Sequence, residues 1–191
     1  KQEDWKFLDI SQIIKKNISD LSFFNDFSQP NEVDPSIFVD GLEHNKIIFI
    51  NGRIEKIDFN YEDQNKIEIN DETKKDVSFD YENSLIDLNG AFTHKVFKII
   101  IKKNYSLKRP LIIYQSTNDK IKSTNINLRL NFELGENSCL RLIDYFTNNT
   151  AKNFINIFYN FNLEKNSILK NYKIDKLRNA NLKYSFNNIE Q

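Results

Sequence analysis

The sequence has few of the residues that cross-link a small fold, bend its backbone or bind its cofactors. Among 191 residues there are one cysteine, three prolines, four glycines and one tryptophan. A single cysteine, Cys139, cannot form an intrachain disulfide, which excludes a disulfide-stapled scaffold. The four glycines are too far apart to form a phosphate-binding loop. No apolar run approaches the roughly 20 residues that a membrane-spanning helix needs.

Net charge is also absent, because 27 Lys and Arg residues balance 27 Asp and Glu residues. Nucleic-acid binding through bulk positive charge is therefore not expected. The 39% hydrophobic and 28% charged content suits one globular domain. The sequence starts at Lys1 and contains no methionine, so we expect a fragment or a processed form.

What the sequence does contain is an internal repeat, Asn-Phe-x-Leu-x-x-Asn-Ser-x-Leu. Its copies begin at Asn131 and Asn160, a period of 29 residues (160 − 131). A weaker copy begins at Ile99, 33 residues before Phe132 (132 − 99). Each copy is typical of strand, short polar turn, strand, and a fixed period indicates stacked units. We predict a β-solenoid with one coil per copy; the alternative is a plain antiparallel sheet in an Asn-rich chain.

The elements before the repeat are of mixed type. Asn51-Gly52 between apolar runs predicts a β-hairpin at 46–59. A short strand is expected around 67–69, and a short helix within 81–92. After these come short β-rich segments at 96–101, 111–114, 126–132, 140–146, 154–161, 168–174 and 182–186.

These elements suggest two regions. Residues 1–95 would form an N-terminal lead-in with the hairpin and the short helix, and residues 96–191 would form the coils. Trp5 is expected to anchor the N-terminal segment, and a capped helical turn is expected at Ser11.

Two alternative sets of residues on the coil strands could face the interior. One parity is the more apolar but leaves Leu140 and Leu169 pointing outward; the other places them inside. The first set consists of Cys139, Ile143 and Tyr145 aligned with Ile168, Tyr172 and Ile174.

Residues with catalytic or ligand chemistry are sparse. His44, His94 and Cys139 have no metal-ligand spacing, so no metal site is expected. Cys139 occupies the repeat position of Ile168 and is expected to be a small buried hydrophobe.

Carboxylates are more common than these, and sugar-cleaving β-helix enzymes use them on a coil face. Asp144 and Asp175 are the candidates by position, and both are expected to be solvated residues at strand ends. The predicted catalytic, cofactor-binding and metal-binding sets are therefore empty.

Five further segments follow one another along the chain: Glu3-Asp4-Trp5-Lys6-Phe7-Leu8-Asp9-Ile10, Ile47-Ile48-Phe49-Ile50-Asn51-Gly52-Arg53, Leu88-Asn89-Gly90-Ala91-Phe92, Pro110-Leu111-Ile112-Ile113 and Gly135-Glu136-Asn137-Ser138. In this order they resemble segments of the SufB/SufD family of iron–sulfur cluster assembly proteins, and of its SufD members in particular. The similarity extends over essentially the whole chain and rests on their shared order.

The resemblance implies a mainly β fold, a right-handed parallel β-helix (solenoid) with a small N-terminal α/β lead-in. It implies a non-catalytic scaffold subunit in a cytoplasmic complex with a SufB-like paralogue and a SufC-like ATPase. The complex assembles the cluster, and this fragment would bind no cofactor, nucleic acid or membrane. The family's cluster-related residues and ATPase-binding segment belong to a C-terminal half missing from residues 1–191, so no site residue is carried over. The alternatives are a β-helix carbohydrate-active enzyme and a plain protein-interaction module.

Overall fold

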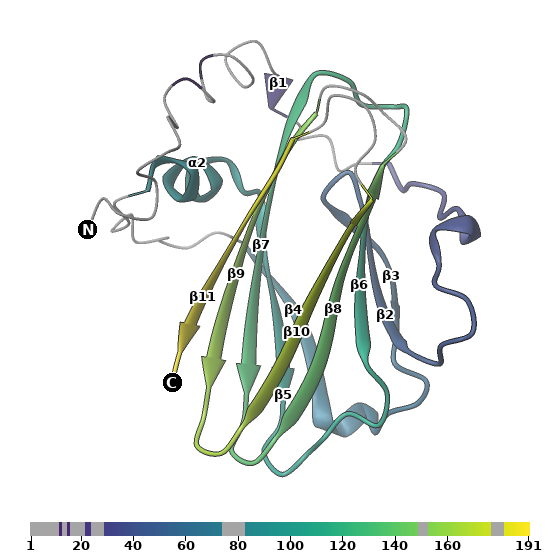
Figure 1. The fold of residues 1–191 in the computed structure, drawn as a ribbon, viewed down its shortest axis with the longest axis vertical. Helices are drawn as coiled ribbons and strands as arrows, with labels where there is room; N and C mark the ends of the chain where they lie inside the picture. The colour runs from purple at the N-terminus through teal and green to yellow at the C-terminus, as the bar shows by residue number, and fades with distance from the viewer. Residues whose placement is uncertain are drawn as a thin grey trace.

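The computed structural model describes residues 12, 15, 22–23, 29–73, 83–148, 153–176 and 182–191. It is mainly β and contains two mixed sheets (Figure 1). Sheet A has the order β11 (Leu182–Glu190), β9 (Phe154–Leu163), β7 (Thr124–Leu134), β5 (Lys95–Ile101) and β4 (Ile67–Thr73), with β1 (Ser22–Phe23) beside β7. Sheet B has the order β10 (Ile168–Lys176), β8 (Cys139–Asn148), β6 (Leu111–Thr117), β2 (Asn45–Ile50) and β3 (Arg53–Asp58).

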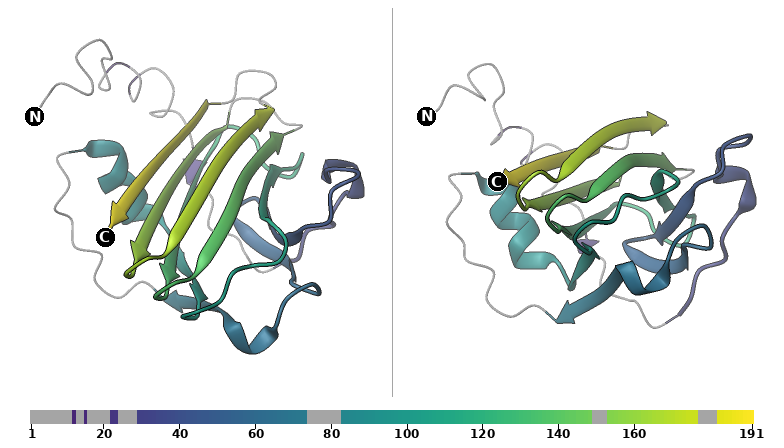
Figure 2. Two further views of the ribbon diagram at one scale, coloured as in Figure 1. Left: turned by 60° about the horizontal axis from the view of Figure 1, so that its bottom comes forward. Right: turned by 90° about the horizontal axis from the view of Figure 1, so that it is seen from below.

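From β5 to β11 the chain alternates between the two sheets, one strand at a time. Neighbours within a sheet along this stretch are parallel, because each return passes through a strand of the other sheet. Only the outer pairs β2–β3 and β4–β5 are antiparallel among the pairings described. Viewed from below, the strands from β5 to β11 stack in chain order within each sheet, from teal to yellow (Figure 2).

The strand register reproduces the sequence repeat. Phe132 pairs with Phe161 in sheet A, and Cys139 pairs with Ile168 in sheet B. The weaker copy is also in register, because Ile99 pairs with Phe132. The predicted alignment of the copies is therefore confirmed, and the plain antiparallel alternative is wrong for these strands.

Stacked asparagines mark the turn between the strands of each copy. Asn104, Asn137 and Asn166 have φ of 58°, 56° and 58°, a left-handed conformation that Asn tolerates better than most residues. The Asn137 side-chain amide donates to Asn104 Oδ1 at 2.9 Å, and that of Asn166 donates to Asn137 Oδ1 at 3.0 Å. A Cβ on Gly135 would lie 2.6 Å from the Lys103 backbone nitrogen, so this close approach of turns requires glycine.

The main core lies between the two sheets, and its position settles the parity of the coil strands. Leu140 and Leu142 are fully buried in it, and Leu169 packs against it. The more apolar set that includes Ile143 and Tyr145 instead faces outward, where a second cluster forms. Both faces of sheet B are apolar near β2 and β6, which is why apolar content alone could not decide between the two sets.

Each sheet has a cover on part of its outer face. Helix α2 (Ser84–Phe92) packs against β7 and β9 of sheet A, and the segment around η2 (Pro35–Ile37) covers β2 and β6 of sheet B (Figure 1). Asn89 on α2 donates to the carbonyl oxygens of Leu128 and Asn156. These bonds fix the helix to a sheet whose outer face is polar at this point.

Most predicted elements are confirmed with small shifts of their ends. The predicted hairpin is β2–β3, and Asn51 and Gly52 both have positive φ, 53° and 81°, as its tight turn requires. The predicted helix begins at Ser84 after the N-cap Asn83, and the expected short strand is β4. η3 (Gln64–Lys66) precedes β4. Trp5 and Ser11 lie outside the described residues.

The division at residues 95 and 96 stays a prediction. Strands from both predicted regions share the same sheets, because β2 pairs with β6 and β4 pairs with β5.

Candidate functional site

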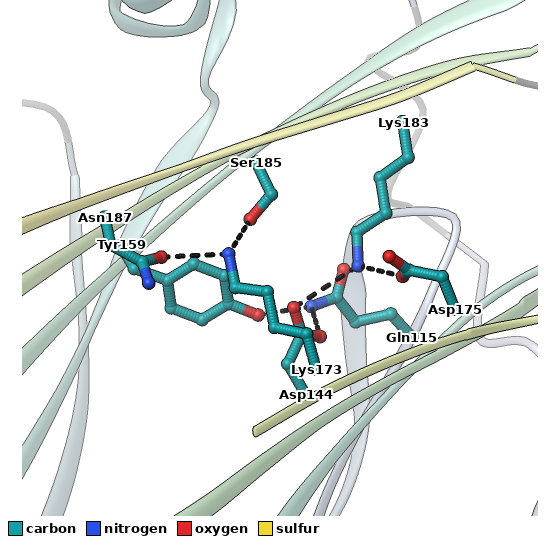
Figure 3. Close-up of polar contacts among 8 residues, drawn as sticks. All are labelled: Gln115, Asp144, Tyr159, Lys173, Asp175, Lys183, Ser185 and Asn187. Carbon is teal, nitrogen blue, oxygen red and sulfur yellow. Dashed lines mark hydrogen bonds and ion pairs between the residues drawn. The ribbon is translucent and has the colours of Figure 1, made fainter. Parts of the chain in front are cut away.

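The side chains that fill the space between the sheets change in polarity along the stack of strands. Inward positions are apolar on the first strands and polar or charged on the last ones. Register aligns three such columns: Ile113, Asp144 and Lys173; Ile126, Ile155 and Lys183; and Leu130, Tyr159 and Asn187. The last strands therefore bring their polar groups into one cluster, which is drawn in Figure 3.

Asp144 on β8 is the centre of this cluster and is fully buried. Gln115 on β6 donates from Nε2 to Asp144 Oδ1 at 2.8 Å and to Tyr159 Oη at 2.6 Å. The Lys183 ammonium on β11 donates to Asp144 Oδ2 at 3.2 Å (Figure 3). Asp144 thus connects strands of both sheets.

Lys183 is the cation that joins the two acids. Its Nζ lies 2.6 Å from Asp175 Oδ1, and its side chain is only 3% exposed. The ammonium also lies 5.0 Å from the ring centre of Phe146, within cation–π range. The Lys183 charge is therefore neutralised by carboxylates rather than by water.

A second lysine, Lys173 on β10, occupies the outer part of the cluster. Its Nζ donates to Ser185 Oγ at 2.6 Å and to Asn187 Oδ1 at 3.0 Å (Figure 3). It also lies 5.4 Å from the ring centre of Tyr159. These contacts tie β10 of sheet B to β11 of sheet A.

Burial perturbs the titration of several members. It raises the pKa of Asp144 above its usual range, against the opposing charge of Lys183. It also raises the pKa of the Tyr159 phenol well above its usual value, an effect reinforced by the negative charge of Asp144. It lowers the pKa of Lys173, although the charge of Asp144 acts in the other direction. Each shift disfavours the charged form of its group.

The charged groups of the cluster pair with one another. Two carboxylates and two ammonium groups balance, and Lys183 contacts Asp144 and Asp175 of the cluster and the neighbouring Phe146 ring. Such pairs are costly to break on one side, because the remaining charge is left buried without a partner. In the part of the chain that the structure describes, no group of three His, Cys, Asp or Glu residues could hold a metal ion.

The two candidate acids are brought together, but their expected environment is wrong for Asp144. It was expected to be solvated and is buried, because its position in β8 faces the core. Asp175 is partly exposed, as its side chain is 39% accessible. A pair of carboxylates that shares one lysine inside the molecule differs from a pair that flanks a substrate bond in a cleft.

The histidines and the cysteine take other places. His44 is buried, with Nδ1 near the Leu42 carbonyl oxygen and Nε2 2.8 Å from Tyr114 Oη. Cys139 is only partly buried, because the outer side of β8 is open there, so its predicted burial is wrong. It does occupy the position of Ile168, as expected.

A cavity lies at the opposite end of the stack from the charged cluster. Its volume is about 300 Å³, and it is bounded by the β2–β3 turn and by β4, β5 and β7. Its lining includes Arg53, His94 and Lys95, with Asp71 paired to Lys95. His94 is thus at a surface cavity, away from the Asp144 cluster.

Lys173, Lys183, Gln115 and Tyr159 were missed by reasoning from the sequence. A signal for Lys173 existed, because it lies one repeat period after Asp144, and opposite charges in register are expected to meet. Lys183 had no such signal, since β11 lies beyond the second copy of the repeat.

Comparison with known proteins does not assign this chain to a family. No family model matches the sequence, and no curated protein matches it. Among the described residues, the helices are too short or too polar to cross a membrane.

Proposed function

We propose that this chain is a non-catalytic scaffold subunit of an iron–sulfur cluster assembly complex, built as a right-handed parallel β-helix. The observation that carries the proposal is the parallel stacking of the repeat copies, in which β7–β9 and β8–β10 share one register. This stacking adds to the ordered series of segments that resembles the SufB/SufD family. A chain that alternates between two layers of parallel strands supports the β-helix that the resemblance implies.

A scaffold role also agrees with how the interior is used. Large side chains fill the space between the sheets, and Phe132 and Phe161 stack at 5.1 Å between ring centres. Such a spine is quasi-one-dimensional, because each coil contacts only its neighbours along the stack, and it presents an extended surface. It can hold partner surfaces at fixed separations without taking part in the chemistry.

The partners in this proposal are a SufB-like paralogue and a SufC-like ATPase in the cytoplasm. The iron–sulfur cluster is the cargo of the whole complex. We place the contacts with the ATPase mostly outside residues 1–191, as the resemblance implies.

The alternative of a carbohydrate-active enzyme is less favoured. It requires clustered acids with exposed aromatic side chains along one cleft. Asp144 is instead fully buried and shares Lys183 with Asp175. The third candidate, a plain interaction module, differs from the proposal only in its link to cluster assembly.

Affinity purification from the native cytosol tests the proposal. A tagged full-length protein is expected to recover an ATPase subunit and a paralogous β-helix subunit, identified by mass spectrometry. The matched control is residues 1–191 with the same tag, which should not retain the ATPase. Recovery of no ATPase by the full-length protein contradicts the function, and a stable ATPase complex with residues 1–191 alone contradicts the placement of the contacts.

A further inference from the structure

The outer side of β8 and β10 forms an exposed surface with apolar and basic side chains. We call it the β8–β10 face; it consists of Cys139, Arg141, Ile143, Tyr145, Ile168, Lys170, Tyr172, Ile174 and Lys176. Ile168, Tyr172 and Ile174 are 52%, 60% and 41% exposed. Large apolar side chains that gather at this exposure mark interaction sites more often than scattered ones do.

The charge on this face has one sign. Arg141, Lys170 and Lys176 are exposed there, and the β8–β10 face contains no carboxylate. Arg141 is held in place, because its Nη2 donates to the carbonyl oxygens of Leu107 and Lys108. Lys176 lies 5.2 Å from the ring centre of Tyr145. An acidic partner would meet cations that are already positioned.

The neighbouring part of the same side of sheet B is already covered, by residues 31–40 of the chain itself. This covering segment packs Val33, Ile37, Phe38 and Val39 onto a cluster that continues to Tyr145 and Ile143. Its sequence, Asn31-Glu32-Val33-Asp34-Pro35-Ser36-Ile37-Phe38-Val39-Asp40, alternates apolar groups with three carboxylates.

Three contacts show how the covering segment is held on sheet B. The Val39 backbone N–H donates to Tyr114 Oη at 3.0 Å, and the Phe38 ring lies edge-on to Tyr114 at 5.2 Å. On its other side Phe38 meets the Lys46 ammonium, 5.6 Å from the ring centre. Tyrosine and lysine side chains on the outer side of sheet B therefore contact the covering segment.

We propose that the β8–β10 face is a docking site for an extended segment of a partner protein that alternates apolar and acidic side chains. Tyr145 and Tyr172 extend the tyrosine surface that begins at Tyr114. Lys170 and Lys176 add cations for the carboxylates of a partner, whereas Lys46 contacts the Phe38 ring and pairs with Asp58. The 5.4 Å contact between Tyr114 and Tyr145 makes the face continuous with the covered part. The proposal goes beyond the scaffold function and does not depend on which complex the chain joins.

A second copy of this chain is a poor occupant for this face. Two β8–β10 faces in contact would bring like charges together, which is unfavourable at an interface. A partner with carboxylates between its apolar residues satisfies both features of the face.

The test uses a fluorescein-labelled synthetic peptide with the sequence of residues 31–40, added to the intact chain. Fluorescence anisotropy at low salt is expected to show saturable binding. The matched control peptide replaces its three acids as Glu32→Gln, Asp34→Asn and Asp40→Asn, and it should bind at least about tenfold more weakly, since loss of the charge pairs costs roughly 1.4 kcal/mol or more at that ratio.

Protein variants locate the site. The double variant Lys170→Glu with Tyr172→Ser should weaken binding of the acidic peptide at least about tenfold, whereas Lys120→Glu, at another exposed lysine, should change it less than about twofold. Circular dichroism and the urea midpoint confirm that each variant is folded. A third variant, Arg141→Gln, provides a milder charge loss if the double variant is unstable.

Several outcomes would overturn the proposal. These are no saturable binding of the acidic peptide, equal binding of the amide peptide, or unchanged binding by the variants on the face. Binding to vesicles of anionic phospholipid in place of the peptide would make the face a membrane contact instead. Concentration-dependent dimers that the same variants abolish would assign it to a second copy.

Discussion

Single buried rings carry much of the stability of this fold, and Phe161 is the clearest test. It is fully buried and stacks on Phe132 at 5.1 Å. Phe161→Ala is expected to lower the free energy of unfolding by about 3–5 kcal/mol, from lost transfer energy and the cavity left behind. Urea unfolding measures it. Phe92→Ala, at a ring that is 46% exposed, is the control and should cost under about 1 kcal/mol. A similar small loss for Phe161→Ala would contradict its inward position.

A second residue, Glu62, should give a recognisable pH dependence. Its carboxylate accepts bonds from Asn45, from Tyr105 and from the backbone N–H groups of Lys108 and Arg109. Burial by itself would raise the pKa of Glu62, but these bonds outweigh it, and the pKa is lowered from 4.5. A lowered folded-state pKa stabilises the protein above the unfolded pKa, and this stability is lost as the pH falls through the folded pKa.

Glu62→Gln is therefore expected to destabilise the protein at pH 7 by about 1–3 kcal/mol, because buried donors lose their acceptor. The difference from the unsubstituted protein should shrink as the pH falls below 4.5. Urea unfolding over a pH series measures both effects. Glu68→Gln, at an exposed pair with Lys102, is the control and should have little effect at any pH. A difference that stays constant with pH would show that the Glu62 charge is not involved.

The candidate site shows that the type of a residue does not by itself determine its burial or its partners. Asp144 is a candidate by its position in the sequence, but its burial depends on which alternate residues of β8 face the space between the sheets. The sequence does not decide this, because both sets of alternate residues are apolar. The Asp144 partners Gln115, Tyr159 and Lys183 come from β6, β9 and β11. Only the Lys173 alignment was accessible from the repeat. Tyr159 and Lys183 reach Asp144 from the other sheet, and Gln115 on neighbouring β6 pairs in register with Phe146 rather than with Asp144.

At the scale of elements, the turn asparagines make a local prediction. Asn137 has φ of 56° and both donates and accepts side-chain bonds within the stack of turns. Asn137→Ala should cost about 1–2 kcal/mol, because alanine is strained in this conformation and has no amide. Asn137→Gly removes the amide but not the conformational freedom, so it should cost less than Asn137→Ala. Equal losses, measured by urea unfolding, would show that conformation has no part in the effect.

Elements were predictable wherever local chemistry decides them. The Asn51-Gly52 turn, the α2 region and the positions of all seven coil strands follow from turn residues and β-rich runs. The 29-residue period also gave the pairing of β8 with β10. The choice of inward-facing side stayed open because residues 31–40 cover part of the outer side of sheet B. A contact so distant in sequence leaves no periodic signal.

At the scale of the whole molecule, each sheet ends in an edge strand that pairs on one side only among the described residues, and the two edges lie on the same side of the stack. β10 and β11 are the terminal strands in their sheet orders. The Ile168 N–H donates to the Ser138 carbonyl oxygen, next to β8. Every second residue from Ile168 onward therefore directs its N–H toward β8, and the residues between them, including Asn171, direct their N–H toward the edge. Unpaired edges of this kind promote association between chains.

Residues 1–191 are therefore expected to self-associate as concentration rises, which sedimentation velocity measures. Asn171→Pro removes a donor at the free edge without breaking the β8 ladder, and it should keep the chain monomeric. Tyr172→Pro is the matched control; it removes a donor that faces β8, so it should destabilise the fold instead. A monomeric unsubstituted chain at all concentrations would contradict edge pairing, and association unchanged by Asn171→Pro would place the contact on another surface.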